Sequence, residues 1–116
     1  MTVLNCKNCG GDHWGSFSTE RREIADHIKA NCLGRVMVLS GDQHGAGFDD
    51  GTNHDFATGG GCPLPTFQAA PLDQFTAGPA APAYTGGWFQ NNGQYGTMQI
   101  ADSGGTIDVT WEVHDS

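Results

Sequence analysis

The spacing of apolar residues predicts one helix in the first third of the chain. Three of them recur every four positions and so share one helical face: Ile24, Ile28 and Cys32. Ser18 or Thr19 is a suitable N-cap, because a hydroxyl oxygen can accept a hydrogen bond from a free amide of the first turn. Gly34 is placed to end the helix in a left-handed conformation. We therefore expect a helix from this cap to Cys32.

A short apolar run at residues 36–39 follows the helix and predicts a buried strand, so that the two elements form an α/β unit. The strand stops at a turn of small residues that carries Asp42 and His44 between two glycines. Ligands of open α/β sheets bind outside the carboxyl ends of strands. An aspartate and a histidine projected from one strand end are a plausible pair of metal ligands.

Residues 45–94 show no lasting helix or strand periodicity and are dominated by small and polar residues. Loops this long are normally functional or disordered. Disordered segments contain few aromatic residues, so the scattered aromatic residues predict that much of this loop is packed: Phe48, Phe56, Phe67, Phe75, Tyr84, Trp88 and Phe89. Residues 77–83 are the best candidate for a mobile tip.

The last quarter of the chain predicts a β-hairpin, with strands at 97–101 and 106–113 and a turn at 102–105. Apolar residues alternate with polar ones along the second strand, which predicts one buried and one solvated face: Ile107, Val109, Trp111 and Val113. The expected fold is a single small α/β (α+β) domain over residues 1–116. It combines one helix, a short buried strand, long Gly/Pro-rich loops and the hairpin.

Composition narrows the possible functions. The chain has 116 residues, of which 37% are hydrophobic and 18 are glycine, so we expect a small hydrophobic core. A fold with so small a core is expected to need a metal or a second copy of the chain for its stability. A net charge of −8 makes binding to nucleic acid phosphates unfavourable. No apolar stretch approaches the ~20 residues of a membrane span, and the N-terminus shows no signal peptide. We expect a soluble homo-oligomer.

The cysteines leave two interpretations open. Cys6 and Cys9 have the spacing of half a zinc site, and His13 with Cys32 or Cys62 could complete it. The sequence contains no second close pair of cysteines, which favours free thiols in a reducing compartment.

Several segments together carry a resemblance to a known family: Asp12-His13-Trp14-Gly15, Glu20-Arg21 opening the helix, the strand and turn at 38–44, the glycine-rich residues 58–61, and Gly93-Gln94-Tyr95-Gly96 before the hairpin. In order and spacing, residues 12–116 resemble the C-terminal part of PhoD-like alkaline phosphatases, within the calcineurin-like metallophosphoesterases. Residues 1–11 match nothing in this family.

The resemblance implies a partial αββα sandwich with a two-metal site at the strand ends. The general family motif at this turn is Gly-His-x-His, and here Asp42 and His44 occupy the two ligand positions. The resemblance therefore implies that Asp42 and His44 are catalytic metal ligands in the hydrolysis of a small phosphate ester. Two cations (Zn, Fe, Mn or Ca) could hold the ester and generate hydroxide.

The other ligand-bearing turns of the family are missing from this sequence, so we expect a truncated or minimal enzyme. Cys6, Cys9, His13, the polar loop 49–55 or a second subunit could replace the missing ligands. That loop has the composition of a calcium loop without its spacing, which favours a solvated polar loop. The alternatives are a non-catalytic dimerising fragment and a small zinc-stabilised module that uses Cys6 and Cys9. Members of the family are often exported, and the sequence leaves localisation open.

Overall fold

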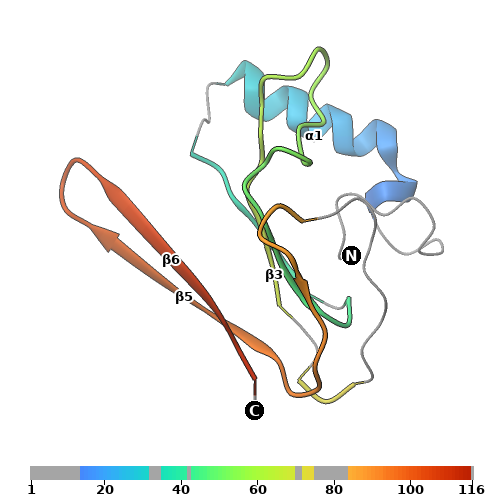
Figure 1. Ribbon diagram of the computed structural model, residues 1–116. Helices are drawn as coiled ribbons and strands as arrows, with labels where there is room; N and C mark the ends of the chain where they lie inside the picture. The colour runs from blue at the N-terminus through green and yellow to red at the C-terminus, as the bar shows by residue number, and fades with distance from the viewer. Residues whose placement is uncertain (1–13, 32–34, 42, 70–71, 75–83, 116) are drawn as a thin grey trace.

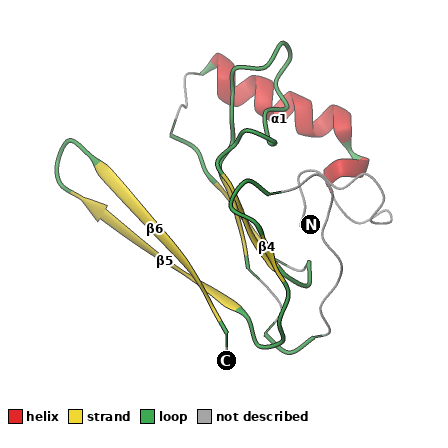
Figure 2. Cartoon of the chain, in the orientation of Figure 1, coloured by secondary structure: helices red, strands yellow, loops and turns green. Residues whose placement is uncertain are grey.

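The computed structural model describes residues 14–31, 35–41, 43–69, 72–74 and 84–115. It shows a mixed α/β arrangement of one α-helix and two separate sheets in this part of the chain (Figures 1 and 2). The elements in chain order are η1 (Trp14–Ser16), α1 (Ser18–Ala30), β1 (Val38–Ser40), β2 (Ala46–Asp49), β3 (Thr66–Gln68), β4 (Trp88–Phe89), β5 (Tyr95–Asp102) and β6 (Ile107–His114). No helix in the described ranges is long and apolar enough to cross a membrane.

Helix α1 confirms the predicted helix and its apolar face, because Ala25 is fully buried and Ile28 packs against the core. The predicted cap at Ser18 or Thr19 is wrong. Phe17 is the cap residue and no side chain bonds to the free amides, since the preceding turn η1 leads directly into the helix. Asn31 follows the last turn, and its side chain donates to the main-chain oxygen of His27 over 2.8 Å. Cys32 and Gly34 lie outside the described residues.

The main sheet has four strands in the order β1-β3-β2-β4. β1 and β3 are parallel, with Val38 opposite Thr66, whereas β2 runs antiparallel to both β3 and β4. The expectation of a segment without strands at 45–94 is therefore wrong. Its strands are two to four residues long, which is too short for a periodic pattern to develop.

A small core joins α1 to the loop between β2 and β3. Its buried members are Ala25, Ala57, Cys62 and Leu64, and Cys62 has a free thiol. Hydrogen bonds also join the helix to this loop beside the core. Lys29 Nζ donates to the main-chain oxygen of Thr58 over 3.0 Å, and Asp26 accepts from the amide and hydroxyl of Thr58. The helix is thus fastened to this loop by charged side chains as well as by apolar contact.

Strands β5 and β6 form the predicted hairpin, which extends away from the rest of the molecule (Figure 1). One face is apolar, with Met98 opposite Trp111 and Ile100 opposite Val109. Near the main sheet this face is covered, because Trp111 packs on Phe67 with ring centroids 5.3 Å apart. At the far end Ile107 is 52% exposed, so the predicted buried face is wrong for that residue. The hairpin extends beyond the sheet that covers its base.

Candidate functional site

The turn that carries His44 follows strand β1, as predicted. Two consecutive short hydrogen bonds fold it: the Gln43 amide donates to Gly41 over 2.9 Å, and the Gly45 amide donates to Gln43 over 2.7 Å. Because β1 and β3 are parallel, their carboxyl ends lie at the same edge of the sheet. His44 is half-buried at this edge. Asp42 lies outside the described residues, so its pairing with His44 stays a prediction.

Gln68, the last residue of β3, fastens this turn to the sheet. Its side-chain nitrogen donates to the main-chain oxygen of Gln43 over 3.0 Å and to that of Gly41 over 3.4 Å. Gln68 is fully buried and its acceptors are half-buried, so competing water has limited access to these bonds. The main-chain amide of Ala69 adds a bond to Ser40 over 3.2 Å. Sequence reasoning missed Gln68, because a single amide within an apparent loop carries no recognisable signal.

Three buried polar atoms around the turn have no hydrogen-bond partner within the part of the chain that the structure describes. They are the side-chain oxygens of Gln43 and Gln68 and the indole nitrogen of Trp88. The indole lies against Gly45, where an added Cβ would be 2.9 Å from Trp88 Nε1. An unpaired buried polar group costs about 1 to 3 kcal/mol. The surroundings of His44 therefore offer hydrogen-bonding capacity that the described protein groups leave unused.

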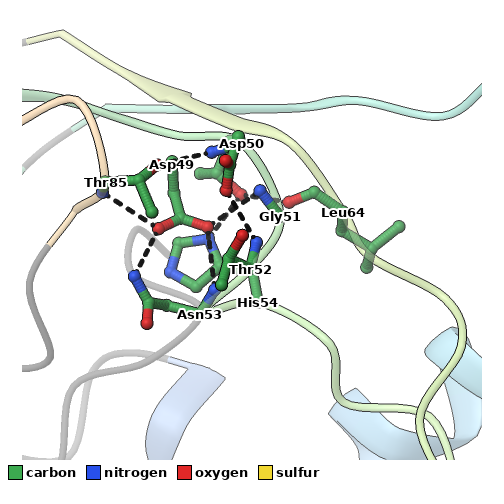
Figure 3. A network of polar contacts seen from close by, with 9 residues as sticks. Asp49, Asp50, Gly51, Thr52, Asn53, His54, Leu64 and Thr85 are labelled. Atoms are coloured by element: carbon green, nitrogen blue, oxygen red, sulfur yellow. Dashed lines mark hydrogen bonds and ion pairs between the residues drawn. The ribbon is translucent and has the colours of Figure 1, made fainter.

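The polar loop after β2 is organised around Asp49 (Figure 3). Asp49 is fully buried, and its carboxylate accepts from the amides of Gly51 over 2.9 Å, Asn53 over 3.2 Å and Thr85 over 3.2 Å. The side chain of Asn53 donates a further bond over 2.8 Å. The expectation of a solvated polar loop is wrong for Asp49. This carboxylate bonds the loop to itself and to Thr85, so its oxygens are already occupied by donors.

The other carboxylates of this loop also bond to nearby main chain. Asp50 accepts from the amide of Thr52 over 2.9 Å, and the bonds from Thr52 lower the pKa of Asp50. Asp55 accepts from Gly61 over 2.6 Å and from Cys62 over 3.1 Å. These bonds organise the turns on either side of the loop.

His54 is a buried, neutral histidine that sequence reasoning did not single out. Its ring is 2% exposed, and Nδ1 lies 2.7 Å from the hydroxyl of Thr66. That hydroxyl donates to the main-chain oxygen of Leu64, so Nδ1 carries the proton and donates to Thr66. Burial lowers the pKa of His54, while Asp49, 3.9 Å away, opposes the shift. Tyr84 packs edge-on against the ring, and burial raises the pKa of its hydroxyl to about 12.

The described ranges contain no group of three or more histidine, cysteine, aspartate or glutamate side chains that could hold a metal ion. Of the predicted ligands they contain His44, whereas Asp42, Cys6 and Cys9 fall outside them. The structure thus places one predicted ligand at the predicted strand end. Comparison of the chain with models of known protein families, with curated proteins and with solved structures finds no match.

Proposed function

We propose that the chain functions in the metal-dependent hydrolysis of small phosphate esters, with His44 and Asp42 as metal ligands at the carboxyl end of β1. The observation that carries the proposal is the set of unpartnered buried atoms around this turn, on Gln43, Gln68 and Trp88. Buried polar groups without a partner are uncommon in folded proteins and call for a specific explanation. A bound ion with its water and a phosphate ester would supply such partners.

Each group at the turn has a role that suits this chemistry. The imidazole of His44 and the carboxylate of Asp42 are ligand types that zinc, iron and manganese accept. Gln68 holds the turn in place through the main-chain oxygen of Gln43, which positions the main chain that carries His44 relative to the sheet. Trp88 Nε1 is a hydrogen-bond donor that suits an anionic oxygen. When bound, a pair of cations polarises the phosphoryl oxygen and lowers the pKa of a bound water.

The remaining ligands are assigned by the same proposal to residues outside the described part of the chain or to a second copy in a homo-oligomer. Cys6, Cys9 and His13 are the candidates within one chain. We propose in addition that the four-stranded sheet with α1 is part of an αββα metallophosphoesterase sandwich. The parallel pairing of β1 with β3 next to the His44 turn supports this arrangement, because strand ends are common ligand sites in α/β folds.

The test combines metal content, solution mass and hydrolysis. The purified chain is loaded with Zn²⁺, Mn²⁺, Fe²⁺ or Ca²⁺ and assayed with 4-nitrophenyl phosphate and bis(4-nitrophenyl) phosphate. We expect His44→Ala to lower metal affinity by at least tenfold and to abolish hydrolysis. His27→Ala is the matched control, because His27 is an exposed histidine on α1. It should leave both properties unchanged.

Hydrolysis that survives both chelation and His44→Ala would refute the proposal. Zinc that is lost in Cys6→Ser but retained in His44→Ala would identify the zinc-stabilised module instead. A dimer that takes up none of the four metals and hydrolyses neither ester would identify the non-catalytic fragment.

A further inference from the structure

A cleft lies between the hairpin and the main sheet, and Trp88, whose indole was assigned above to the proposed phosphate site, is among its lining residues. Its volume is about 790 Å³, within the usual range of small-molecule sites. Strands β2, β3 and β4 supply one wall and β6 supplies the other. The aromatic residues of the lining are Phe48, Phe67, Trp88 and Phe89 from the sheet and Trp111 from the hairpin.

The sheet register explains why these rings face the cleft together. Phe48 lies directly opposite Phe67, and the two rings stack with centroids 5.1 Å apart. Phe89 lies opposite Ala46, two residues before Phe48, so it extends from the same face of the sheet. Trp111 tilts against Phe67 from the hairpin. Phe48, Phe67 and Trp111 therefore form one stacked aromatic group in the cleft, and Phe89, on the same face of the sheet, is 50% exposed.

The polar part of the cleft is built around Asp115. Its two carboxylate oxygens accept one bond each, from Asn91 Nδ2 over 2.8 Å and from Gln94 Nε2 over 2.9 Å. These bonds fix the orientation of the carboxylate, and they lower the pKa of Asp115, which keeps the group ionised. Each oxygen retains a lone pair for another donor. Asp115 is the charged residue of the described lining, so the cleft is negative.

Gln94, which also lines the cleft, has a hydrogen-bond acceptor that is unpaired within the described part of the chain. Its side chain is 1% exposed, and its Oε1 atom has no hydrogen-bond partner among the described residues. Since Nε2 is committed to Asp115, the unused capacity is that of an acceptor. A buried acceptor without a donor is unfavourable, and a donor from a molecule in the cleft would relieve it. Within the described ranges Gln94 thus lacks a donor, and the exposed carboxylate of Asp115 can accept one more bond on each oxygen.

We propose that this cleft binds a small organic cation, an arylalkyl- or alkylammonium. Its apolar part packs on the aromatic wall, and its N–H groups donate to Asp115 and Gln94. Aromatic faces attract cations through their negative quadrupole, which adds to the attraction of the carboxylate. An anionic ligand is repelled by Asp115 and by the net charge of −8. The site needs neither a metal nor His44, so its ligand binding can be tested separately from the function proposed above, although Trp88 belongs to both sites.

Calorimetry with three probes of similar shape tests the proposal: 2-phenylethylammonium, neutral 2-phenylethanol and anionic 3-phenylpropanoate. We expect the ammonium to bind at least tenfold more tightly than the alcohol, and the carboxylate to show no binding. Asp115→Asn should weaken ammonium binding at least tenfold and leave the alcohol unchanged. The control is Asp108→Asn, which removes the same charge from the opposite face of the hairpin. It should change neither affinity.

A variant of the aromatic wall provides the second arm. Phe89→Ser, at a half-exposed position, should weaken the ammonium and the alcohol by a similar factor. Equal affinities for the three probes would overturn the proposal, and so would equal losses in the Asp115 and Asp108 variants. Absence of binding by a chain that is dimeric in solution would also overturn it, because a second copy would then cover the cleft.

Discussion

Gln68 donates a hydrogen bond from its side chain to the main-chain oxygen of Gln43 over 3.0 Å, although 25 residues separate them in sequence. This bond joins the last residue of β3 to the turn that follows β1. His44 is the next residue of that turn, so its position depends on a side chain from a different strand. The proposed ligand is thus held by the sheet as well as by the local turn.

Gln68→Leu tests this dependence. Leucine has a similar size but removes the two bonds that Gln68 donates, so the main-chain oxygens of Gln43 and Gly41 keep only the amide bonds of the turn. We expect the free energy of unfolding to fall by about 1 to 3 kcal/mol, because two hydrogen bonds of about 0.5 to 1.5 kcal/mol each are lost. Urea denaturation followed by tryptophan fluorescence measures the change. Gln99→Leu, on the solvated face of β5, is the control and should stay within about 0.5 kcal/mol of the parent. Equal losses in both variants would contradict this role of Gln68.

His54 predicts a pH dependence of stability. Burial lowers the pKa of His54 below the ordinary histidine value of 6.5, so the unfolded chain takes up a proton before the folded chain does. The free energy of unfolding therefore falls as pH drops below about 6.5 and through the folded-state pKa, and this contribution is fully present above 6.5. Denaturation at several pH values from 7.5 to about 4.5 measures it.

His54→Gln removes this titration and keeps a side chain that can bond to Thr66, so stability should depend less on pH in that interval. His27→Gln is the control, because His27 is exposed on α1. The carboxylates with lowered pKa, Asp26, Asp50 and Asp115, lose their contributions only as pH falls through a lower range, below about 3.8. An unchanged pH dependence in His54→Gln would show that another group titrates.

At Gly96 the base of the hairpin passes close to Ala69, the residue that follows β3. A Cβ at this position would lie 2.8 Å from Ala69 Cβ and 3.0 Å from Trp111 Nε1. We expect Gly96→Ala to destabilise the protein by about 1 to 3 kcal/mol, because overpacking displaces the base of the hairpin. A Cβ at Gly105, in the hairpin turn, would meet nothing within 4 Å. Denaturation of Gly105→Ala should therefore match the parent, and a loss as large as that of Gly96→Ala would refute the packing argument.

Elements with a long local pattern could be predicted from the sequence. Helix α1 shows its apolar face at every fourth residue, and β6 alternates over its whole length, so both were recognisable. Strand β1 was predicted from its apolar residues, but it begins two residues later and ends one residue later than expected. The prediction that it is buried is wrong, because Leu39 is 65% exposed. Where packing differs from the pattern, as at Ile107, the reason is that nothing in the described chain covers the far end of the hairpin.

The strands β2, β3 and β4 could not be predicted, because their stability depends on partners distant in sequence. Gly47 in β2 pairs with both Gln68 and Trp88, and no local signal specifies either partner. The same limit applies to the candidate site. The position of His44 after a strand followed from the apolar run before it. The bonds from Gln68 and the contact of Trp88 with Gly45 depend on tertiary packing.

The most direct test of the central claim is the ¹H–¹⁵N spectrum of the histidine side chains during addition of Zn²⁺. The His44→Gln variant assigns the His44 signals by their loss. We predict that the ring nitrogens of His44 move to metal-bound chemical shifts and that those of the exposed His27 stay unchanged. Saturation of the protein with zinc while the His44 signals remain at their initial positions would contradict the claim that this turn binds a metal.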